Sequence, residues 1–384
     1  MELLSWAEIF TKILWQFVPV WVAMAVIMSV SVVYKRRLGL YGRLYDSLVG
    51  IIGFSIVLFW VLTALLADMI ITMDPLQQVS GMKNKVPGTP VRGMEDAWYL
   101  LGGDNLARDI FSRMVMGARH VLSIAPAATA FAFMVGITLG LPAGYFGRRL
   151  DTNLSFLANL VLAFPVILLF YLLVTPEIRD EGIPIFMAAV LFLFPIIFLF
   201  LLFQSRYYTQ PMTRNLYCGI TIILGLWAYS GLAFNADPLD VFYMDPNLLN
   251  VFVSVVFVNS PTVFRIVRGI TLDIKTRDYV AAAQTRGEGA WYIMLWEILP
   301  NARGPLIVDF CLRIGYTTIL LGTLGFFGLG VSPESPDWGS TINDGRKLLS
   351  IYPHPALPPA LALMSLVLGL NLLADGLREE SLKD

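Results

Sequence analysis

The most informative segment of the chain is Thr276 to Pro300, TRDYVAAAQTRGEGAWYIMLWEILP, which has a polar front and lies between two long apolar runs. Its first part favours a helix: Asp278 is placed to cap a short helix through three alanines. Gly287 can adopt the left-handed conformation that ends this helix. A second helical turn runs from Trp291 to Trp296, and Pro300 interrupts it. Two short helices joined at a glycine form a rigid shape that another protein can grip.

Composition indicates a membrane protein. Of 384 residues, 57% are hydrophobic and 14% are charged, and the mean hydropathy is +0.69. A soluble domain carries about 25% charged residues. The net charge of −1 argues against a nucleic-acid partner. Cys218 and Cys311 both lie in apolar runs, so no disulfide framework is implied. His120 and His354 lack the spacing of metal ligands, so we expect no metal site.

Nine apolar runs are close to, or longer than, the roughly 20 residues that a spanning helix needs. They cover residues 14–33, 48–73, 122–146, 154–174, 184–203, 216–234, 249–267, 305–329 and 357–373. The first run has acidic residues before it and Lys35, Arg36 and Arg37 after it. We therefore interpret it as a retained helix with its N-terminus outside, and not as a cleaved signal. With nine crossings, three features lie on the inner side of the membrane: the Arg/Lys clusters that flank spans, the 276–300 loop and the C-terminus.

Two further patterns concern helix packing. Helical spacing of apolar residues between Leu101 and Arg119 predicts an amphipathic helix along the outer membrane surface. This helix is either packed on the bundle or in contact with a docking partner. Gly136, Gly140 and Gly144 recur every four residues and permit close helix approach, either within this chain or across a subunit boundary.

The last third of the chain holds two more candidate features. Asp309 and Arg313 are four residues apart within a span, which favours a structural ion pair over a functional charge. Residues 331–355 are expected to form an outer loop. One interpretation of this loop is a structured turn with Trp338 at the membrane interface. The other rests on a resemblance described below and places the loop near the external mouth of the bundle.

At the 276–300 stretch the chain resembles the permease subunits of binding-protein-dependent ABC importers. The resemblance is to the second permease of the dipeptide, oligopeptide and nickel branch. The family's loop reads Glu-Ala-Ala, three residues, Gly and, about a dozen residues later, Leu-Pro. The matching residues here are Ala282, Ala283, Gly287, Leu299 and Pro300, and the family's Glu falls on Ala281. Similar family-like stretches occur at residues 101–119, where Ala107 replaces a glycine, and at 143–151, 332–339 and 371–378.

The resemblance implies an all-α integral membrane protein, a polytopic helical bundle of the ABC importer permease type. Together with the nine apolar runs it gives about nine transmembrane helices. Residues 1–45 would add an N-terminal helix with a basic link, and residues 46–384 would form the permease domain with its six-helix family core. The chain departs from the family by an inserted helical hairpin at about 175–247. The resemblance assigns this insertion no role, and we interpret it as padding of the bundle or a lipid contact.

The resemblance also implies partners and a site. The chain would pair with a homologous permease in the bacterial inner membrane, receive solute from a periplasmic binding protein and contact two ABC ATPase subunits. Those subunits would bind ATP and magnesium, so the chain itself needs no cofactor. The 276–300 loop would couple to an ATPase through a set of residues that lie in or next to the family motif. They are Asp278, Ala281, Ala282, Ala283, Gly287, Leu299 and Pro300.

The chemistry that the sequence lacks agrees with a transport subunit. It contains no Gly-Lys dipeptide, hence no phosphate-binding loop, and no nucleophile–base motif. We therefore do not expect an enzyme. An ion-driven carrier working without ATPase subunits is the alternative function, and a non-transporting membrane scaffold is a third. No residue is identified as a selectivity site, so dipeptides, oligopeptides, nickel chelates and oligosaccharides all remain open as cargo.

Overall fold

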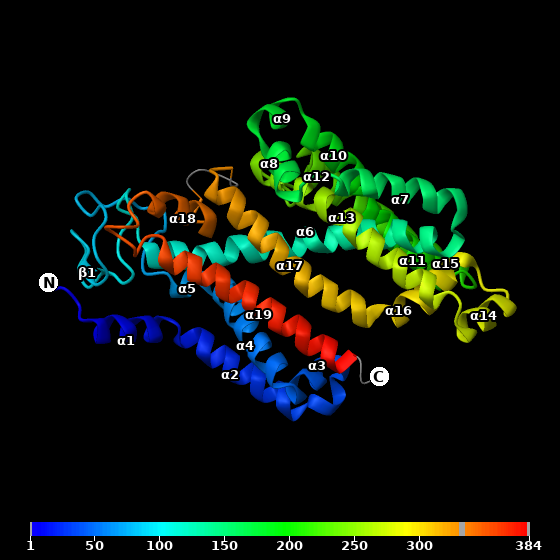
Figure 1. The fold of residues 1–384 in the computed structure, drawn as a ribbon, viewed down its shortest axis with the longest axis horizontal. Coiled ribbons are helices and arrows are strands. Elements are labelled where there is room, and N and C mark those ends of the chain that lie inside the picture. The colour runs from blue at the N-terminus through cyan, green and yellow to red at the C-terminus, as the bar shows by residue number, and fades with distance from the viewer. Residues whose placement is uncertain (1, 330–334, 382–384) are drawn as a thin grey trace. The chain divides into compact units, whose positions relative to one another are not determined.

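The computed structural model describes residues 2–329 and 335–381, which are mostly helical (Figure 1). The chain divides into two compact units, residues 1–126 with 311–384 and residues 127–310. Helices α6 (Ile110–Phe146) and α17 (Arg303–Phe326) contribute to both. Within the described residues, seven helices are long and apolar enough to span a bilayer, and two bent helix pairs raise the number to nine. Each predicted run corresponds to one of these, so the polytopic helical fold is confirmed.

The first unit contains the N-terminal elements and the C-terminal helices. They are α1 (Trp6–Gln16), α2 (Val18–Val33), η1 (Lys35–Arg37), α3 (Gly39–Arg43), η2 (Leu44–Asp46), α4 (Leu48–Leu65), α5 (Ala67–Ile70), β1 (Thr89–Pro90), β2 (Trp98–Tyr99), α18 (Trp338–Arg346) and α19 (Leu357–Ser381). The pair α1 and α2 bends by 53° at Phe17, just before Pro19 in the first turn of α2. The second predicted span ends earlier than expected, at Leu65.

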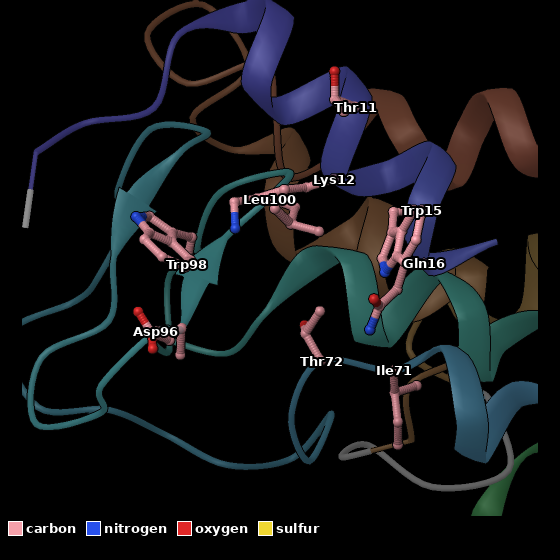
Figure 2. Close-up of a pocket in the computed structure, with 10 residues that line it drawn as sticks. Thr11, Lys12, Trp15, Gln16, Ile71, Thr72, Asp96, Trp98 and Leu100 are labelled. Atoms are coloured by element: carbon pink, nitrogen blue, oxygen red, sulfur yellow. The ribbon is translucent and has the colours of Figure 1, made fainter. Parts of the chain in front are cut away.

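The N-terminal helix α1 is held on the segment that contains the two short strands, which pair antiparallel. The backbone N–H of Leu4 donates to the carbonyl of Gly88 at 3.0 Å, and the Lys12 ammonium lies 4.0 Å from the centre of the Trp98 ring. Figure 2 shows Lys12 and Trp98 beside a hollow of about 500 Å³, which Trp15 and Asp96 also line. The extra helix is therefore part of the packed first unit.

The family-like stretch 101–119 does not form a surface helix, so that prediction is wrong. Residues 101–109 form turns, and α6 begins at Ile110 as part of a spanning helix. Ile110, Phe111 and Val115 are buried, because the apolar face that suggested a lipid-surface helix packs inside the protein. The Tyr99 hydroxyl closes the preceding turn by donating to the carbonyl of Ala107 at 2.7 Å.

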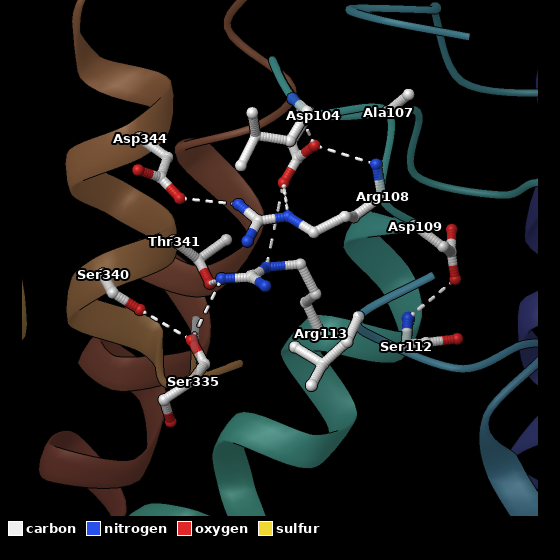
Figure 3. A network of polar contacts seen from close by, with 12 residues as sticks. Asp104, Ala107, Arg108, Asp109, Ser112, Arg113, Ser335, Ser340, Thr341 and Asp344 are labelled. Carbon is white, nitrogen blue, oxygen red and sulfur yellow. Dashed lines mark hydrogen bonds and ion pairs between the residues drawn. The ribbon is translucent and has the colours of Figure 1, made fainter. Parts of the chain in front are cut away.

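A buried ionic cluster joins this stretch to α18 (Figure 3). The Arg108 guanidinium pairs with Asp104 at 2.6 Å and with Asp344 at 2.7 Å. Arg113 donates to the carbonyl of Ser335 at 3.1 Å and to the hydroxyl of Thr341 at 3.1 and 3.2 Å. Both arginines are almost fully buried, so the loss of one partner would leave an uncompensated charge inside the first unit.

The predicted outer loop 331–355 contains helix α18, and its family-like residues 332–334 lie outside the described residues. Trp338 is fully buried, and its indole N–H donates to the carbonyl of Met114 at 2.8 Å. Its assignment to the membrane interface is therefore wrong. The partner carbonyl is more than 200 residues away in the sequence, which is why local reasoning placed the ring outside.

The second unit contains the remaining helices. They are α7 (Arg148–Leu162), α8 (Val166–Val174), α9 (Pro176–Asp180), α10 (Ile183–Leu191), α11 (Leu193–Arg206), α12 (Pro211–Phe234), α13 (Pro246–Ile274), α14 (Asp278–Thr285), α15 (Ala290–Tyr292), the π-helical segment η3 (Ile293–Ile298) and α16 (Leu299–Asn301). Helices α7 and α8 bend by 81° at a break before Val166, where Pro165 cannot donate a backbone hydrogen bond. Helices α9 to α12 lie within the predicted insertion 175–247.

The core of this unit contains a glycine seam between α6 and α13. A methyl group added at Gly136 would lie 2.5 Å from Val263, at Gly140 2.9 Å from Val267, and at Gly144 2.7 Å from Thr271. Of the two packing alternatives left open by the glycine spacing, contact within the chain is therefore the one observed. Asp309 and Arg313 both lie on α17, and their pairing stays a prediction.

Candidate functional site

The alanine-rich part of the 276–300 stretch forms helix α14, which ends as the sequence predicts. Gly287 follows the helix with a φ of +80°. Its N–H donates to the carbonyl of Gln284 at 3.0 Å, and the N–H of Glu288 donates to the carbonyl of Ala283 at 3.2 Å. These two bonds form a Schellman motif, which satisfies the last carbonyls of a helix and fixes the direction of the chain beyond it.

The predicted role of Asp278 as the helix cap is wrong. The cap position is held by Arg277, whose backbone is extended, and Asp278 is the first helical residue without a capping hydrogen bond within the described chain. The helix starts one residue early because a turn precedes it, in which the N–H of Arg277 donates to the carbonyl of Ile274 at 3.0 Å. The carboxylate of Asp278 still lies at the positive end of the helix dipole.

Helix α14 has a buried face and an exposed face. Val280 and Ala283 have no exposed surface and belong to a core cluster with Ile293, Met294 and Ile298. Ala281 and Ala282 are exposed, as is Gly287. Val280 and Ala283 are three residues apart, which places them on one side of the helix. The two halves of the segment therefore pack on each other, and only part of the family motif faces outward.

Pro300 does not interrupt the second half, contrary to expectation. Helical backbone continues from Ala290 through η3 and α16 to Asn301, and α17 begins at Arg303. A proline ring inside an α-helix would meet the carbonyl four residues earlier. The wider π-helical turn directly before Pro300 relieves this conflict. The segment is therefore joined to the spanning helix α17 with little irregular chain between them.

Polar contacts fix the segment on neighbouring helices of the same unit. The indole N–H of Trp296 donates to the Ser205 hydroxyl at 3.1 Å, and the Arg206 guanidinium lies 4.6 Å from the centre of the Trp296 ring. Both partners belong to α11, in the insertion. Arg286 pairs with Glu297 at 2.9 Å and so links the two halves of the segment.

The end of α13 and helix α14 are both bonded to the end of α6. The Lys275 ammonium donates to the carbonyl of Gly144 at 2.8 Å, and the Gln284 amide donates to the Tyr145 hydroxyl at 3.1 Å. Arg268 of α13 pairs with Asp151 of α7. These bonds connect the segment to α6 and α13, so a displacement of α14 would act on several helices of the unit.

Two hollows flank the segment. One, of about 590 Å³, is lined partly by Asp273, Arg277 and Tyr279. Burial raises the pKa of the Tyr279 phenol, nearby Arg277 opposes the rise, and Glu297 and Asp273 add to it. The phenol is therefore a neutral hydrogen-bonding group at physiological pH. The other hollow, of about 380 Å³, is apolar, and Leu299 and Pro300 line it.

The predicted site residues therefore do not form one continuous surface. Ala281, Ala282 and Gly287 share the exposed side of α14 and its end, Ala283 is buried, and Leu299 and Pro300 lie at the separate apolar hollow. Sequence reasoning missed the anchoring roles of Val280 and Trp296. The three-residue spacing of Val280 and Ala283 was a usable signal for the first, whereas the contact of Trp296 with α11 had none.

Comparisons with known proteins agree with this architecture. The sequence profile of the family described as "Binding-protein-dependent transport system inner membrane component" matches residues 136–379. The dipeptide transport system permease protein DppC of Alkalihalophilus pseudofirmus is 28% identical over 339 residues, 88% of this chain and 87% of the relative. The glutathione transport system permease protein GsiD of Pectobacterium atrosepticum is 32% identical over 281 residues, 73% and 71% of the two chains. The di/tripeptide transport system permease protein DppC of Pseudomonas aeruginosa is 28% identical over 327 residues, 85% of each.

The fold and the profile together define a multi-pass membrane permease. Because the profile covers more than half of the chain, the protein belongs to the family of binding-protein-dependent transport system inner membrane components. The predicted resemblance to the permease branch that contains the dipeptide systems is confirmed by the relatives. The chain is therefore a permease subunit of a binding-protein-dependent importer, and nothing in the comparisons favours an ion-driven carrier.

Proposed function

We propose that the chain forms half of a translocation path for short peptides, with a homologous permease forming the other half. Two ABC ATPase subunits bind ATP and magnesium in this arrangement, and a periplasmic binding protein delivers the cargo. The protein lies in a bacterial inner membrane with its N-terminus in the periplasm and its C-terminus in the cytoplasm. The names of the relatives denote dipeptides, di/tripeptides and glutathione, which supports a short peptide as the cargo.

In this proposal the 276–300 segment couples the ATPase to the permease. The observation that carries it is the division of α14 into two faces. Val280 and Ala283 fix one face in the core, whereas Ala281 and Ala282 offer small side chains on the other. Small exposed side chains allow a partner's groove to approach the helix backbone closely, and the fixed face makes the helix move as a rigid body.

The coupling step is a change between two packed arrangements. An ATPase that binds nucleotide more tightly in its closed form shifts the equilibrium toward the permease arrangement compatible with that form. Displacement of α14 passes through the Schellman turn and the Arg286–Glu297 pair to η3 and α17. It also passes through Lys275 and Gln284 to the end of α6. Spanning helices of the unit therefore follow the motion of one short helix.

Reconstitution tests the function. Vesicles that contain the chain, its partner permease and both ATPase subunits should take up a labelled dipeptide only with ATP, magnesium and binding protein present. Uptake driven by a proton or sodium gradient, without ATPase subunits, would contradict the proposal.

Membrane orientation is tested separately. Cysteines placed at Arg36 and Arg206, which are both exposed, should react with a membrane-impermeant reagent only from the cytoplasmic side. Labelling from outside intact cells would contradict the nine-crossing topology.

A further inference from the structure

An apolar hollow of about 320 Å³ opens where the inserted hairpin meets the rest of the second unit. Helices α7, α6 and α13 form one side of it, through residues that include Leu154, Ala158 and Phe264. Helices α10 and α11 form the other side, through Val190, Leu191 and Phe194. At about 30 Å³ for a group the size of a water molecule, it has room for about ten methylene-sized groups.

The lining of this hollow has the chemistry of a hydrocarbon site. Its one hydroxyl, on Ser260, donates to the carbonyl of Val256 within its own helix. This hydroxyl therefore needs no hydrogen-bond acceptor from a ligand. Leu157 is 55% exposed and Val190 is 60% exposed, so apolar side chains form the entrance. Helices α6 and α13, the bent pair α7–α8 and the 183–206 stretch all have the length and composition of membrane spans, so we expect this entrance to lie at the depth of the bilayer.

One end of the hollow leads to positive charge. Asp151 and Arg268 pair with each other at one helical turn beyond Leu154 and Phe264, respectively. Arg148, Arg149 and Arg265 are exposed close by on the same two helices. Four arginines and one aspartate give this end a net charge of +3 (4 − 1). Arginine pairs well with a phosphate group because its donors match two phosphate oxygens.

We propose that this hollow is a binding site for an anionic phospholipid, with one acyl chain between the hairpin and the core helices and the phosphate at the arginines. An acyl chain leaves one apolar medium for another when it enters the hollow, so chain burial alone gives little selectivity. Selectivity for this lipid therefore comes from the headgroup charge. The inserted hairpin supplies half of the site, which gives the insertion a specific function.

Photocrosslinking tests the site. The purified importer is incubated with phosphatidylglycerol that carries a diazirine midway along its acyl chain, and with the matching phosphatidylcholine. We expect adducts on α7, α10 and α13, with about tenfold higher yield from phosphatidylglycerol. Equal yields from the two lipids, or adducts confined to other helices, would overturn the proposal.

Matched variants separate filling of the hollow from general damage. Ala158→Phe fills it and should lower the yield about tenfold, whereas Leu160→Phe, on the exposed side of the same helix, should leave it unchanged. Val190→Phe obstructs the entrance at an exposed position and gives the same test without altering the core, should Ala158→Phe fail to assemble. Unchanged yields in Val190→Phe and in any assembled Ala158→Phe protein would contradict the site.

The headgroup and the occupant are tested independently. The double variant Arg148→Gln with Arg149→Gln should reduce the preference for phosphatidylglycerol, while Arg214→Gln, on the hairpin, should retain it. Adducts that form on the isolated chain but disappear in the assembled importer would show that a partner helix fills the hollow, and would overturn the lipid proposal.

Discussion

The buried ionic cluster of the first unit and helix α14 of the second unit both lie in stretches that resemble the same family, yet they differ in construction. In the cluster, Arg108 and Arg113 are buried, and the contacts described above join residues of the same unit. In α14, Ala281 and Ala282 are exposed small side chains on a helix fixed from behind. The two stretches show that family-like residues can be buried or exposed. In our proposal the buried ones hold the fold and the exposed ones of α14 face a partner.

The largest effect is expected at the ionic cluster. Arg108→Ala leaves the buried Asp104 carboxylate without its closest cation and should lower the free energy of unfolding by about 3–5 kcal/mol. Denaturant unfolding of the purified chain in detergent measures this loss. Arg92→Ala, at an exposed position, serves as the control and should change little. If Arg108→Ala were as stable as the wild type, the ionic cluster would have no structural role.

Neighbouring alanines give a sharper test. Ala283→Leu overpacks the core and should cost about 1–3 kcal/mol of stability. Ala282→Leu adds the same atoms on the exposed face and should change stability by less than about 0.5 kcal/mol. We nevertheless expect Ala282→Leu to lower ATP-driven uptake at least about tenfold, because the added side chain separates α14 from its partner. If Ala282→Leu transports normally, the exposed face has no role in coupling.

The turn after α14 gives an intermediate effect. Gly287→Ala should destabilise the protein by roughly 1–2 kcal/mol, since an alanine at φ +80° is in the left-handed region. An added methyl group meets nothing within 4 Å at Gly287 or at Gly289, so steric conflict does not distinguish the two sites, whereas backbone conformation does. Gly289→Ala, at φ −67°, requires no left-handed backbone, so it should cost less, with only the modest penalty of alanine at a helix N-cap. Equal effects at both glycines would contradict the Schellman motif.

The smallest effect is expected at the exposed ion pair. Arg286 and Glu297 are only partly buried, so their coupling should be about 0.2–1 kcal/mol. A double-mutant cycle with Arg286→Gln and Glu297→Gln measures it through thermal unfolding. Raising the salt concentration should weaken the coupling, and a coupling that salt does not affect would show that the pair does not act through charge.

Much of the fold could be predicted because its signals are local. A run of about 20 apolar residues identifies a span without knowledge of its neighbours, and the positive φ of Gly287 was expected because glycine is the residue that adopts it readily. The prediction that Pro300 interrupts the helix was wrong because the preceding π-helical turn accommodates the proline ring. No local sequence pattern predicts such a turn. The burial of Trp338 depends on Met114, which is far away in the sequence.

The position and the end of helix α14 could be predicted, but which of its faces is buried could not. The alanine-rich sequence and Gly287 indicated the helix and its end, yet Ala282 and Ala283 are chemically identical. Which one is buried is decided by how α14 docks on η3, through Val280 and Met294. The insertion had no family pattern to interpret, so its contact with Trp296 could be learned only from the structure.

The most direct test of coupling is a crosslink from α14 to an ATPase subunit. A single cysteine at Ala282, with Cys218 and Cys311 replaced by serine, is treated with a short bifunctional reagent in the assembled importer. A cysteine at Met212, an exposed position of the inserted hairpin, serves as the control. Coupling predicts an ATPase adduct at residue 282 whose yield changes with ATP, and none at residue 212. A residue 282 that forms no adduct and stays open to a water-soluble thiol reagent throughout the cycle would contradict it.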